Sequence, residues 1–309
     1  MRYVYDDVSV RGQFAGHETF PLRLLWLKKA YDAVRRGAAL GTFQEPSAIA
    51  RFGVGRNMAQ SMRYWALAAG FIQECGKQLW PSEIGSLILD DDEGLDPFVE
   101  RMATIWIAHW HIASDPSMTT TAYFAFNNLS TLEFDASGLN RELAELVSLK
   151  GWRATRGTLK RDVEVFLRSY VRRPSGSLED AAEPLLAELG LVREARAGGW
   201  FEFVRGPKPT LPDGVFAYAL ENFWRPDEGG GTTLTAEQVC YAPGSPGRVF
   251  KLDEDSVVTR LMGMADFTGG AWQWTDTAGL RQIQRVGNVD RIDCLRRAYP
   301  AHVPVLEDA

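Results

Sequence analysis

Apolar side chains recur with the spacing of an α-helix in three long stretches of the chain. Residues 21–36 begin with a proline, which suits the first turn of a helix, and their apolar positions form one face. Residues 98–113 are apolar on nearly every side, as in a buried helix. Residues 155–173 have the most regular apolar face, made by Leu159, Val163, Phe166, Leu167 and Tyr170. The pattern predicts two amphipathic helices with one buried helix between them.

Shorter elements follow one another in a definite order between the first two of these helices. Residues 45–88 are typical of a short helix, a tight turn, a longer helix, a β-hairpin around Gly76 and a further short helix. This is the order of a winged helix-turn-helix unit. Stretches that begin near residues 178 and 241 again combine a helix with a strand pair. The predicted fold is mainly α with short β-hairpins (α+β), built from tandem winged-helix-like units.

This order of helices and strand pairs predicts three domains. We expect a winged helix-turn-helix DNA-binding domain over 1–95, a helical middle domain over 96–174 and a winged-helix-like domain over 175–309.

The stretch FGVGRNMAQSMRYW at 52–65 allows two interpretations, a phosphate-binding glycine loop or a turn before a DNA-reading helix. A dinucleotide loop needs G-x-G-x-x-G after a strand, whereas Gly53-x-Gly55 is followed by Met58 and preceded by a helical pattern. The G-x-x-x-x-G-K-[ST] loop of nucleotide-binding ATPases is also missing. We therefore expect neither a nucleotide nor an organic cofactor.

Residues 56–66 place their polar side chains on one face of a helix and most of their apolar side chains on the other. The polar face consists of Arg56, Asn57, Gln60, Arg63 and Tyr64. Arginine can read guanine, and asparagine or glutamine can read adenine, in the major groove. Arginine and tyrosine can also hold phosphate, and the hairpin would bring Lys77 toward the DNA backbone. The alternative is an ordinary amphipathic helix whose polar face contacts only water.

Charge is distributed unevenly along the chain. The net charge of −6 argues against a nonspecific coat for nucleic acid. Residues 1–89 nevertheless carry a net charge of +4 (11 − 7), and residues 141–173 carry +5 (9 − 4), with an acidic segment at 90–100 between them. In the second basic block, the candidates for phosphate binding are Lys160, Arg161 and Arg168. A solvated helix face with a Glu–Arg pair four residues apart explains them equally well.

Two pairs of residues are candidates for phosphodiester hydrolysis. His17 could act as a general base beside Glu18, although the second histidine of an H-E-x-x-H zinc motif is missing. The alternative is a structural histidine beside a helix start. Asp253 and Asp255 belong to an acidic cluster of the kind that holds Mg²⁺ or Mn²⁺ in nucleases. The alternative is a helix cap, supplied by Asp255 or Ser256.

Other residues with metal or thiol chemistry favour structural roles. His109 and His111 are two residues apart on the apolar helix, so their rings diverge and do not easily share a metal. The three cysteines form no C-x-x-C pair, which indicates reduced thiols. The first residues lack the apolar core of a signal peptide, and no apolar run approaches the roughly 20 residues of a membrane helix. We expect a cytoplasmic protein without membrane contact.

Five segments together resemble one bacterial protein family. They are FAGHETFPLR, FGVGRNM with SMRYW, GTLKRDVEVFLRSYV, RGPKPTLP and PGSPGRVFKLDEDS. The likeness runs in order from about residue 12 to about residue 285. The family is a domain-of-unknown-function family of DNA phosphorothioation islands, which includes SspB-like DNA nicking subunits.

The resemblance implies a protein that binds double-stranded DNA and nicks one strand, so that sulfur can replace a non-bridging phosphate oxygen and mark the DNA for antiphage defence. The partners it implies are a cysteine desulfurase, an ATPase and a sulfur-transfer enzyme. The sequence also leaves open that the protein forms a homodimer. The residues themselves support binding better than catalysis, so nicking rests on the resemblance. The alternatives are a non-catalytic DNA-binding adaptor or transcription regulator that recruits the modification proteins, and a protein-interaction scaffold.

Overall fold

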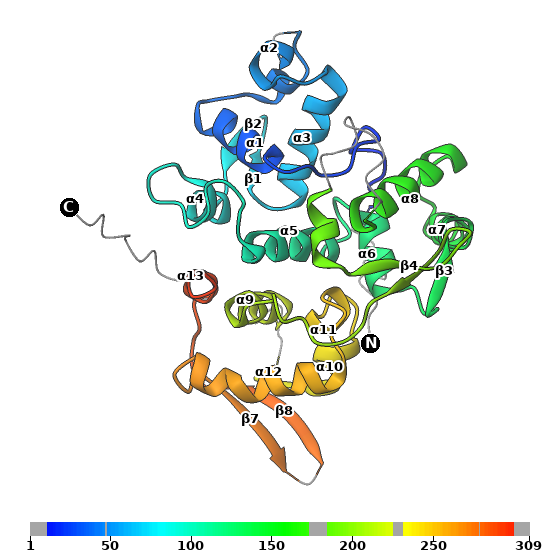
Figure 1. Ribbon diagram of the computed structural model, residues 1–309. Helices are drawn as coiled ribbons and strands as arrows, with labels where there is room; N and C mark the ends of the chain where they lie inside the picture. Colours follow the sequence, from blue (N-terminus) through cyan, green and yellow to red (C-terminus); the bar gives the residue numbers. More distant parts are fainter. Residues whose placement is uncertain (1–10, 47, 173–183, 225–230, 278, 300–309) are drawn as a thin grey trace, which may run out of the picture.

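The computed structural model describes residues 11–46, 48–172, 184–224, 231–277 and 279–299 (Figure 1). Its elements form three groups, and a buried helix that begins the middle group packs against all three. The N-terminal group contains a single antiparallel strand pair, β1 with β2. Its elements are α1 (Trp26–Arg35), η2 (Leu40–Phe43), α2 (Ala48–Phe52), α3 (Arg56–Ala68), β1 (Ile72–Cys75), β2 (Gln78–Pro81) and α4 (Glu83–Leu89).

The middle group begins with the buried helix and ends in a three-stranded antiparallel sheet of order β3-β5-β4. Its elements are α5 (Met102–Ser114), α6 (Thr120–Asn127), β3 (Glu133–Asp135), α7 (Ala136–Lys150), α8 (Arg156–Tyr170), η3 (Leu185–Leu189), β4 (Val192–Arg196) and β5 (Trp200–Phe203). The pairing of β3 with β5 joins residues on both sides of the domain boundary predicted between 174 and 175. The boundary itself lies outside the described residues, and the middle group extends past it to β5.

The C-terminal group repeats the order of the middle group. In both, a helix leads to a short strand, then to further helices and a strand pair, and the first strand bonds to the last one. Its sheet has the order β6-β8-β7. Its elements are α9 (Asp213–Trp224), β6 (Thr233–Thr235), α10 (Ala236–Tyr241), α11 (Pro246–Val249), α12 (Glu254–Phe267), β7 (Trp272–Thr277), β8 (Leu280–Arg285) and α13 (Arg291–Arg296).

The predicted class of mainly helical α+β with short antiparallel strands is confirmed over the described residues. The helix predicted at 21–36 begins later, at Trp26, because Leu25 has a left-handed backbone with φ of 67°. The proline at 21 therefore precedes the helix and does not occupy its first turn, as the pattern had predicted. Among the described helices, none has the length and apolar character needed to cross a membrane.

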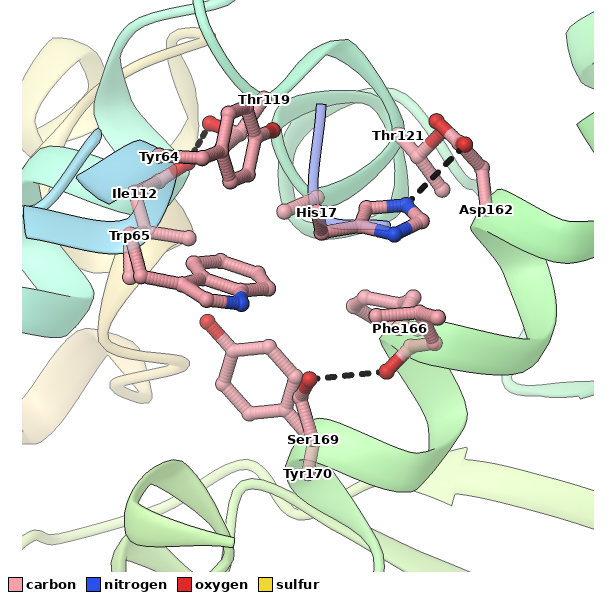
Figure 2. A pocket seen from close by; sticks show the side chains of 12 residues that line it. His17, Tyr64, Trp65, Ile112, Thr119, Thr121, Asp162, Phe166, Ser169 and Tyr170 are labelled. Atoms are coloured by element: carbon pink, nitrogen blue, oxygen red, sulfur yellow. Dashed lines mark hydrogen bonds and ion pairs between the residues drawn. The ribbon is translucent and has the colours of Figure 1, made fainter. Parts of the chain in front are cut away.

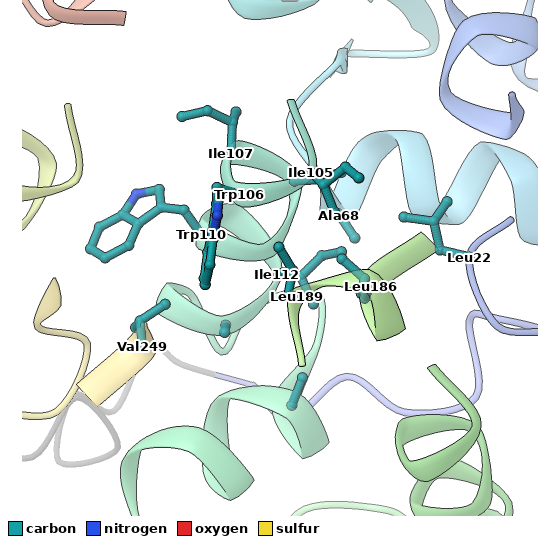
Figure 3. Packing of buried hydrophobic residues seen from close by; sticks show 14 of the residues in the cluster. Leu22, Ala68, Ile105, Trp106, Ile107, Trp110, Ile112, Leu186, Leu189 and Val249 are labelled. Carbon is teal, nitrogen blue, oxygen red and sulfur yellow. The ribbon is translucent and has the colours of Figure 1, made fainter. Parts of the chain in front are cut away.

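Helix α5 is the centre of the core. Its residues from Ala103 to Trp110 are all buried, because neighbours from all three groups pack around it. Figure 3 shows its isoleucine and tryptophan side chains between Leu22 and Ala68 of the N-terminal group, Leu186 of η3 and Val249 of α11. A helix that is apolar on every side is stable only in such surroundings.

The two histidines of α5 are packed as predicted. His109 is fully buried, and its ring accepts from the Tyr170 hydroxyl at Nδ1 (2.8 Å) and donates to the carbonyl of Val249 from Nε2 (2.8 Å). Burial lowers the pKa of His109 to about 3, so this ring is neutral at ordinary pH. His111 hydrogen-bonds instead to the Tyr218 hydroxyl, at 2.9 Å. The rings serve separate packing contacts.

Candidate nucleic-acid interface

Helix α3 begins where the sequence predicts a turn. Gly53 has a left-handed backbone, with φ of 67°, and a side chain there would strain the turn that separates α2 from α3. Gly55 is extended and caps the helix without a side chain, so α3 starts at Arg56. Arg56 and Asn57 are exposed at this start, and Gln60 is half-buried one turn later. The first turn of α3 therefore presents a cation and an amide to solvent.

Two members of the predicted polar face have different surroundings. Arg63 is half-buried, and its Nη1 donates to the carbonyl of Leu40 at 3.4 Å. Tyr64 is only 7% exposed, and its hydroxyl donates to the carbonyl of Met118 at 2.7 Å. Burial, followed by the nearby charge of Asp162, raises the pKa of Tyr64. The placement of Tyr64 on a solvent-exposed face was wrong, because the middle group packs against a second side of α3 that the helical pattern of one segment does not reveal.

The β1–β2 hairpin turns at Gly76 and Lys77, between the paired residues Cys75 and Gln78. Gly76 has φ of 63°, a conformation that glycine adopts without strain in two-residue hairpin turns. Lys77 is exposed at this tip. The hairpin follows α3 directly along the chain, so Lys77 lies on the element that would form a wing.

Helix α8 carries the second set of predicted cations. Lys160 and Arg161 are exposed, whereas Arg168 is half-buried. Lys160 lies 3.9 Å from Glu164, and Arg161 donates to the carbonyl of Gly157 in its own helix at 3.2 Å. The ion pair within this helix therefore joins Glu164 to Lys160, one turn earlier, and not to Arg168, one turn later, as predicted. Both partners are well exposed, so the pair leaves the lysine accessible to another anion.

A short segment before α1 connects α3 to α8, and we name residues 12–20 the bridging loop. Figure 2 shows His17 of this loop between Trp65 of α3 and Asp162 of α8. The ring of His17 lies nearly parallel to the indole of Trp65, with centroids 6.2 Å apart. The indole nitrogen of Trp65 donates to the carbonyl of Phe20 at 2.9 Å, and Arg168 donates to that of Thr19 at 3.1 Å. The bridging loop therefore holds the two helices that carry the predicted DNA contacts.

Asp162 is the buried anchor of this bridge. Its Oδ1 accepts from the backbone N–H of Ala15 (2.9 Å) and from Nε2 of His17 (3.1 Å), and its Oδ2 accepts from the hydroxyl of Thr121 (3.3 Å). The sequence analysis missed Asp162. The available signal was an acid between Leu159 and Val163, on the apolar side of an otherwise basic helix.

Both ring nitrogens of His17 are engaged. Nδ1 accepts from the backbone N–H of Thr19 at 3.2 Å, which leaves the proton on Nε2 for the bond to Asp162. The cavity beside the ring measures about 30 Å³, enough for about one water molecule. This geometry supports the structural interpretation of His17, since a general base needs a free nitrogen within reach of substrate.

The bridging loop has a strained backbone. Ala15, Glu18 and Thr19 all have positive φ, of 64°, 47° and 68°. Left-handed backbone at residues other than glycine costs about 1–3 kcal/mol each and persists only where the surroundings enforce it. Here the hydrogen bonds to α3 and α8 supply that enforcement. Glu18 is half-buried and makes no ion pair within the described part of the chain.

The acidic candidates near residue 253 lie at the start of α12. Asp253 caps this helix, with its Oδ1 accepting from the backbone N–H of Ser256 at 2.8 Å. The hydrogen bonds from Ser256 lower the pKa of Asp253 despite its partial burial. Asp255 is exposed in the first turn. A cap was predicted here, but Asp253 provides it, two residues before the predicted Asp255.

The four catalytic candidates do not form one site. Glu18 and His17 belong to the bridging loop, whereas Asp253 and Asp255 belong to the C-terminal group (Figure 1). Within the described ranges, no three His, Cys, Asp or Glu side chains gather closely enough to hold a metal ion. Magnesium is often held by one or two carboxylates together with substrate phosphates.

Comparison with solved structures finds close similarity over nearly the whole chain. One is described as "Magnesium ion-bound SspB crystal structure", with a TM-score of 0.81 and 24% identity, over 96% of this chain and 89% of that one. Another is described as "SspB crystal structure", with a TM-score of 0.79 and 26% identity, over 94% of this chain and 87% of that one. No curated protein matches significantly.

A family match agrees with this similarity. The family described as "Protein of unknown function (DUF4007)" matches residues 14–299, which include the bridging loop, α3, α8 and the start of α12. The chain belongs to the DUF4007 family.

Proposed function

We propose that this protein is the DNA-binding subunit of a DNA phosphorothioation system. The observation that carries the proposal is the likeness to SspB over 94% of the chain at 26% identity. The resemblance of the five sequence segments also implies a nicking subunit of such a system. The partners we propose are double-stranded DNA, a cysteine desulfurase, an ATPase and a sulfur-transfer enzyme.

Helices α3 and α8 are the proposed DNA-contacting elements. Along the chain, α3 is followed directly by a strand pair, and α8 is followed by η3 and then by a strand pair. The recognition helix of a winged-helix unit also precedes a strand pair. Each also begins with an exposed arginine, Arg56 in α3 and Arg156 in α8. We propose that Arg56 and Asn57 contact base edges or phosphates, with Lys77 on the hairpin and Lys160 and Arg161 on α8 as further phosphate contacts.

Duplex binding tests this proposal. We expect fluorescence anisotropy with a labelled duplex to show binding at low salt that weakens as salt rises. Arg56→Ala should lower the slope of log K against log salt by about one unit if it removes a phosphate contact. Arg296→Ala is the matched control, because Arg296 is exposed on α13 and interacts only weakly with Asp293 at 4.0 Å. Absence of duplex binding at low salt would refute the proposal.

We further propose that the protein nicks one strand, with Mg²⁺ or Mn²⁺ as the metal. The description of one similar structure as magnesium ion-bound supports this choice of metal. Conversion of supercoiled plasmid to the relaxed circle, with either ion and with a chelator, measures the activity directly. Metal-dependent relaxation would support nicking.

A non-catalytic adaptor is the second candidate, and a specific observation favours it. His17 has no free ring nitrogen, and Asp253 is engaged as a helix cap. Such an adaptor would bind DNA and recruit the modification enzymes. DNA binding without relaxation at any metal concentration would select the adaptor.

A further inference from the structure

Strand β7 forms an open edge of the C-terminal sheet. In the order β6-β8-β7 it is hydrogen-bonded to β8 on one side only. Its pairing with β8 runs without a shift in register from Trp272↔Arg285 to Thr277↔Leu280. Figure 1 shows the β7–β8 hairpin projecting from the C-terminal group past α12. The outer side of β7 can therefore accept a further strand.

The direction of the backbone groups in β7 follows from two hydrogen bonds. The N–H of Arg285 in β8 donates to the carbonyl of the residue just before β6, at 2.7 Å. Because successive residues of a strand bond to opposite sides, Trp272, which pairs with Arg285, faces away from β8. The N–H of Trp272 accordingly donates to the hydroxyl of Thr268, at 2.9 Å. By the same alternation, the N–H and C=O groups of Trp274 and Asp276 point outward, and none of them bonds to another residue that the structure describes.

Most other edges of the described sheets have features that discourage pairing with a further strand. Strand β4 carries a bulge between Glu194 and Arg196. Strands β3 and β6 have three residues each, and β2 ends in Pro81. Strand β7 has six residues and contains no proline, no lysine and no break in register. Short strands, bulges, prolines and lysines are the usual means by which edges avoid association, so their absence indicates that β7 is a pairing edge.

We propose that β7 pairs with β7 of a second copy of this chain, antiparallel, about a two-fold axis at Thr275. In this register Trp274 of each copy lies opposite Asp276 of the other. The outward groups of these residues then exchange about four hydrogen bonds, and the two sheets become one continuous sheet. Two-fold pairing of identical surfaces is the commonest symmetry of soluble assemblies. The inference does not depend on DNA binding.

The side chains of β7 complement themselves in this register. Thr275 lies opposite Thr275 of the second copy, and its hydroxyl oxygen is buried without a partner among the described residues. Threonines that face each other across neighbouring strands can hydrogen-bond. Gln273 lies opposite Thr277, and both are exposed. A strand from a different protein would need its own sequence to match these positions, whereas self-pairing requires only β7.

Charge selects the same register. Asp276 is the one charged residue of β7. With the axis at Thr275, the two Asp276 carboxylates are diagonal neighbours, about 7–8 Å apart, and each lies opposite an uncharged side chain. With the axis one residue later, the two carboxylates would lie directly opposite each other, which is destabilising.

Sedimentation velocity of the full chain at a series of concentrations tests the inference. The wild type should change from monomer to dimer as the concentration rises. Thr275→Lys places two ammonium groups opposite each other at the axis, so the Kd of the dimer should rise at least about ten-fold. Gln273→Lys is the matched control, because it adds the same charge on the same face of β7 but opposite the uncharged Thr277. Its Kd should change by less than about two-fold.

Thr275→Cys tests the register directly. The opposed residues of a non-hydrogen-bonded pair have Cα atoms about 4.5 Å apart, which is within reach of a disulfide. Mild oxidation should therefore give a covalent dimer on a non-reducing gel. Thr277→Cys, which lies opposite Gln273, and the wild type, which has the exposed Cys75, should remain uncrosslinked.

Two results would overturn the inference. One is a wild type that stays monomeric at every concentration. The other is a dimer that Thr275→Lys does not weaken and that Thr275→Cys does not crosslink, because such a dimer uses another surface. A wild type that dimerises through Thr275 but binds no duplex would refute the proposed function and support the pairing of β7.

Discussion

Replacement of Asp162 should separate α8 from the bridging loop. Asp162 is 5% exposed, and its carboxylate accepts hydrogen bonds from Ala15, His17 and Thr121 at 2.9, 3.1 and 3.3 Å. Asp162→Ala removes both oxygens and leaves three donors without an acceptor. Asp162→Asn keeps an oxygen for Ala15 and His17 and offers an N–H to the hydroxyl of Thr121.

The two variants should differ clearly in stability. Each buried donor left unsatisfied costs about 1–3 kcal/mol, so the alanine variant should lose at least about 3 kcal/mol. The asparagine variant loses the charge of the acceptor while it keeps the geometry, which costs about 1 kcal/mol. At about 2 °C per kcal/mol in a chain of this size, the unfolding temperature should fall by roughly 6 °C or more for alanine and roughly 2 °C for asparagine.

Differential scanning calorimetry measures both shifts. Glu164→Ala is the control, because Glu164 is an exposed acid on the same helix whose pair with Lys160 spans 3.9 Å. It should change stability by less than about 0.5 kcal/mol. If Asp162→Ala unfolds at the same temperature as Glu164→Ala, the bridging loop is not anchored by this carboxylate. If the affinity of Asp162→Ala for a duplex falls at a temperature at which the variant is still folded, the anchor also orients the helices proposed to contact DNA.

Three further outcomes follow from the buried and capping residues. Tyr64→Phe should cost about 1 kcal/mol of stability through one lost hydrogen bond, and duplex affinity measured by anisotropy should not change, because the hydroxyl is buried. Burial lowers the pKa of His109 from 6.5 to about 3, so only the unfolded chain gains its proton as the pH falls from 6.5 toward 4. The free energy of unfolding, measured by urea titration, should therefore fall by up to about 1.4 kcal/mol for each pH unit of this decrease. The fall should be smaller in His109→Gln. Asp253→Ala should lose about 1 kcal/mol by calorimetry as a missing helix cap, while plasmid relaxation by the same variant should remain if Asp253 has no catalytic role.

The sequence predicted the local elements well because they depend on local residues. The turn at Gly53 and the start of α3 at Arg56 follow from glycine conformation and helical periodicity within one short segment. The burial of α5 likewise follows from its composition. These features need no knowledge of what packs against them.

The candidate site was harder to predict because it depends on contacts between distant segments. Tyr64 looked polar on the helical wheel, yet Met118 accepts from its hydroxyl. Asp162 looked like one acid among many bases, yet its carboxylate accepts hydrogen bonds from the backbone of Ala15 and the ring of His17. The strand pairing of 133–135 with 200–203 crosses a linker-like sequence that had suggested a domain end. The periodicity of a helix indicates the one face that is apolar. It does not indicate a second face that becomes buried because a distant segment packs against it.

Three helices that precede strand pairs differ in the charge at their starts. Helices α3, α8 and α12 each precede a strand pair in their group, with η3 lying between α8 and its strand pair. The first two start with Arg56 and Arg156, whereas α12 starts with Glu254 and Asp255 behind its cap Asp253. An acidic helix start repels phosphate even though the backbone dipole favours anions there. The one cation further along, Arg260, donates to Asp213 at 2.6 Å and to the carbonyl of Leu211 at 2.9 Å. The DNA contacts proposed for α3 and α8 therefore do not extend to α12, because the acidic start of α12 disfavours a phosphate backbone whereas the exposed Arg56 and Arg156 favour one.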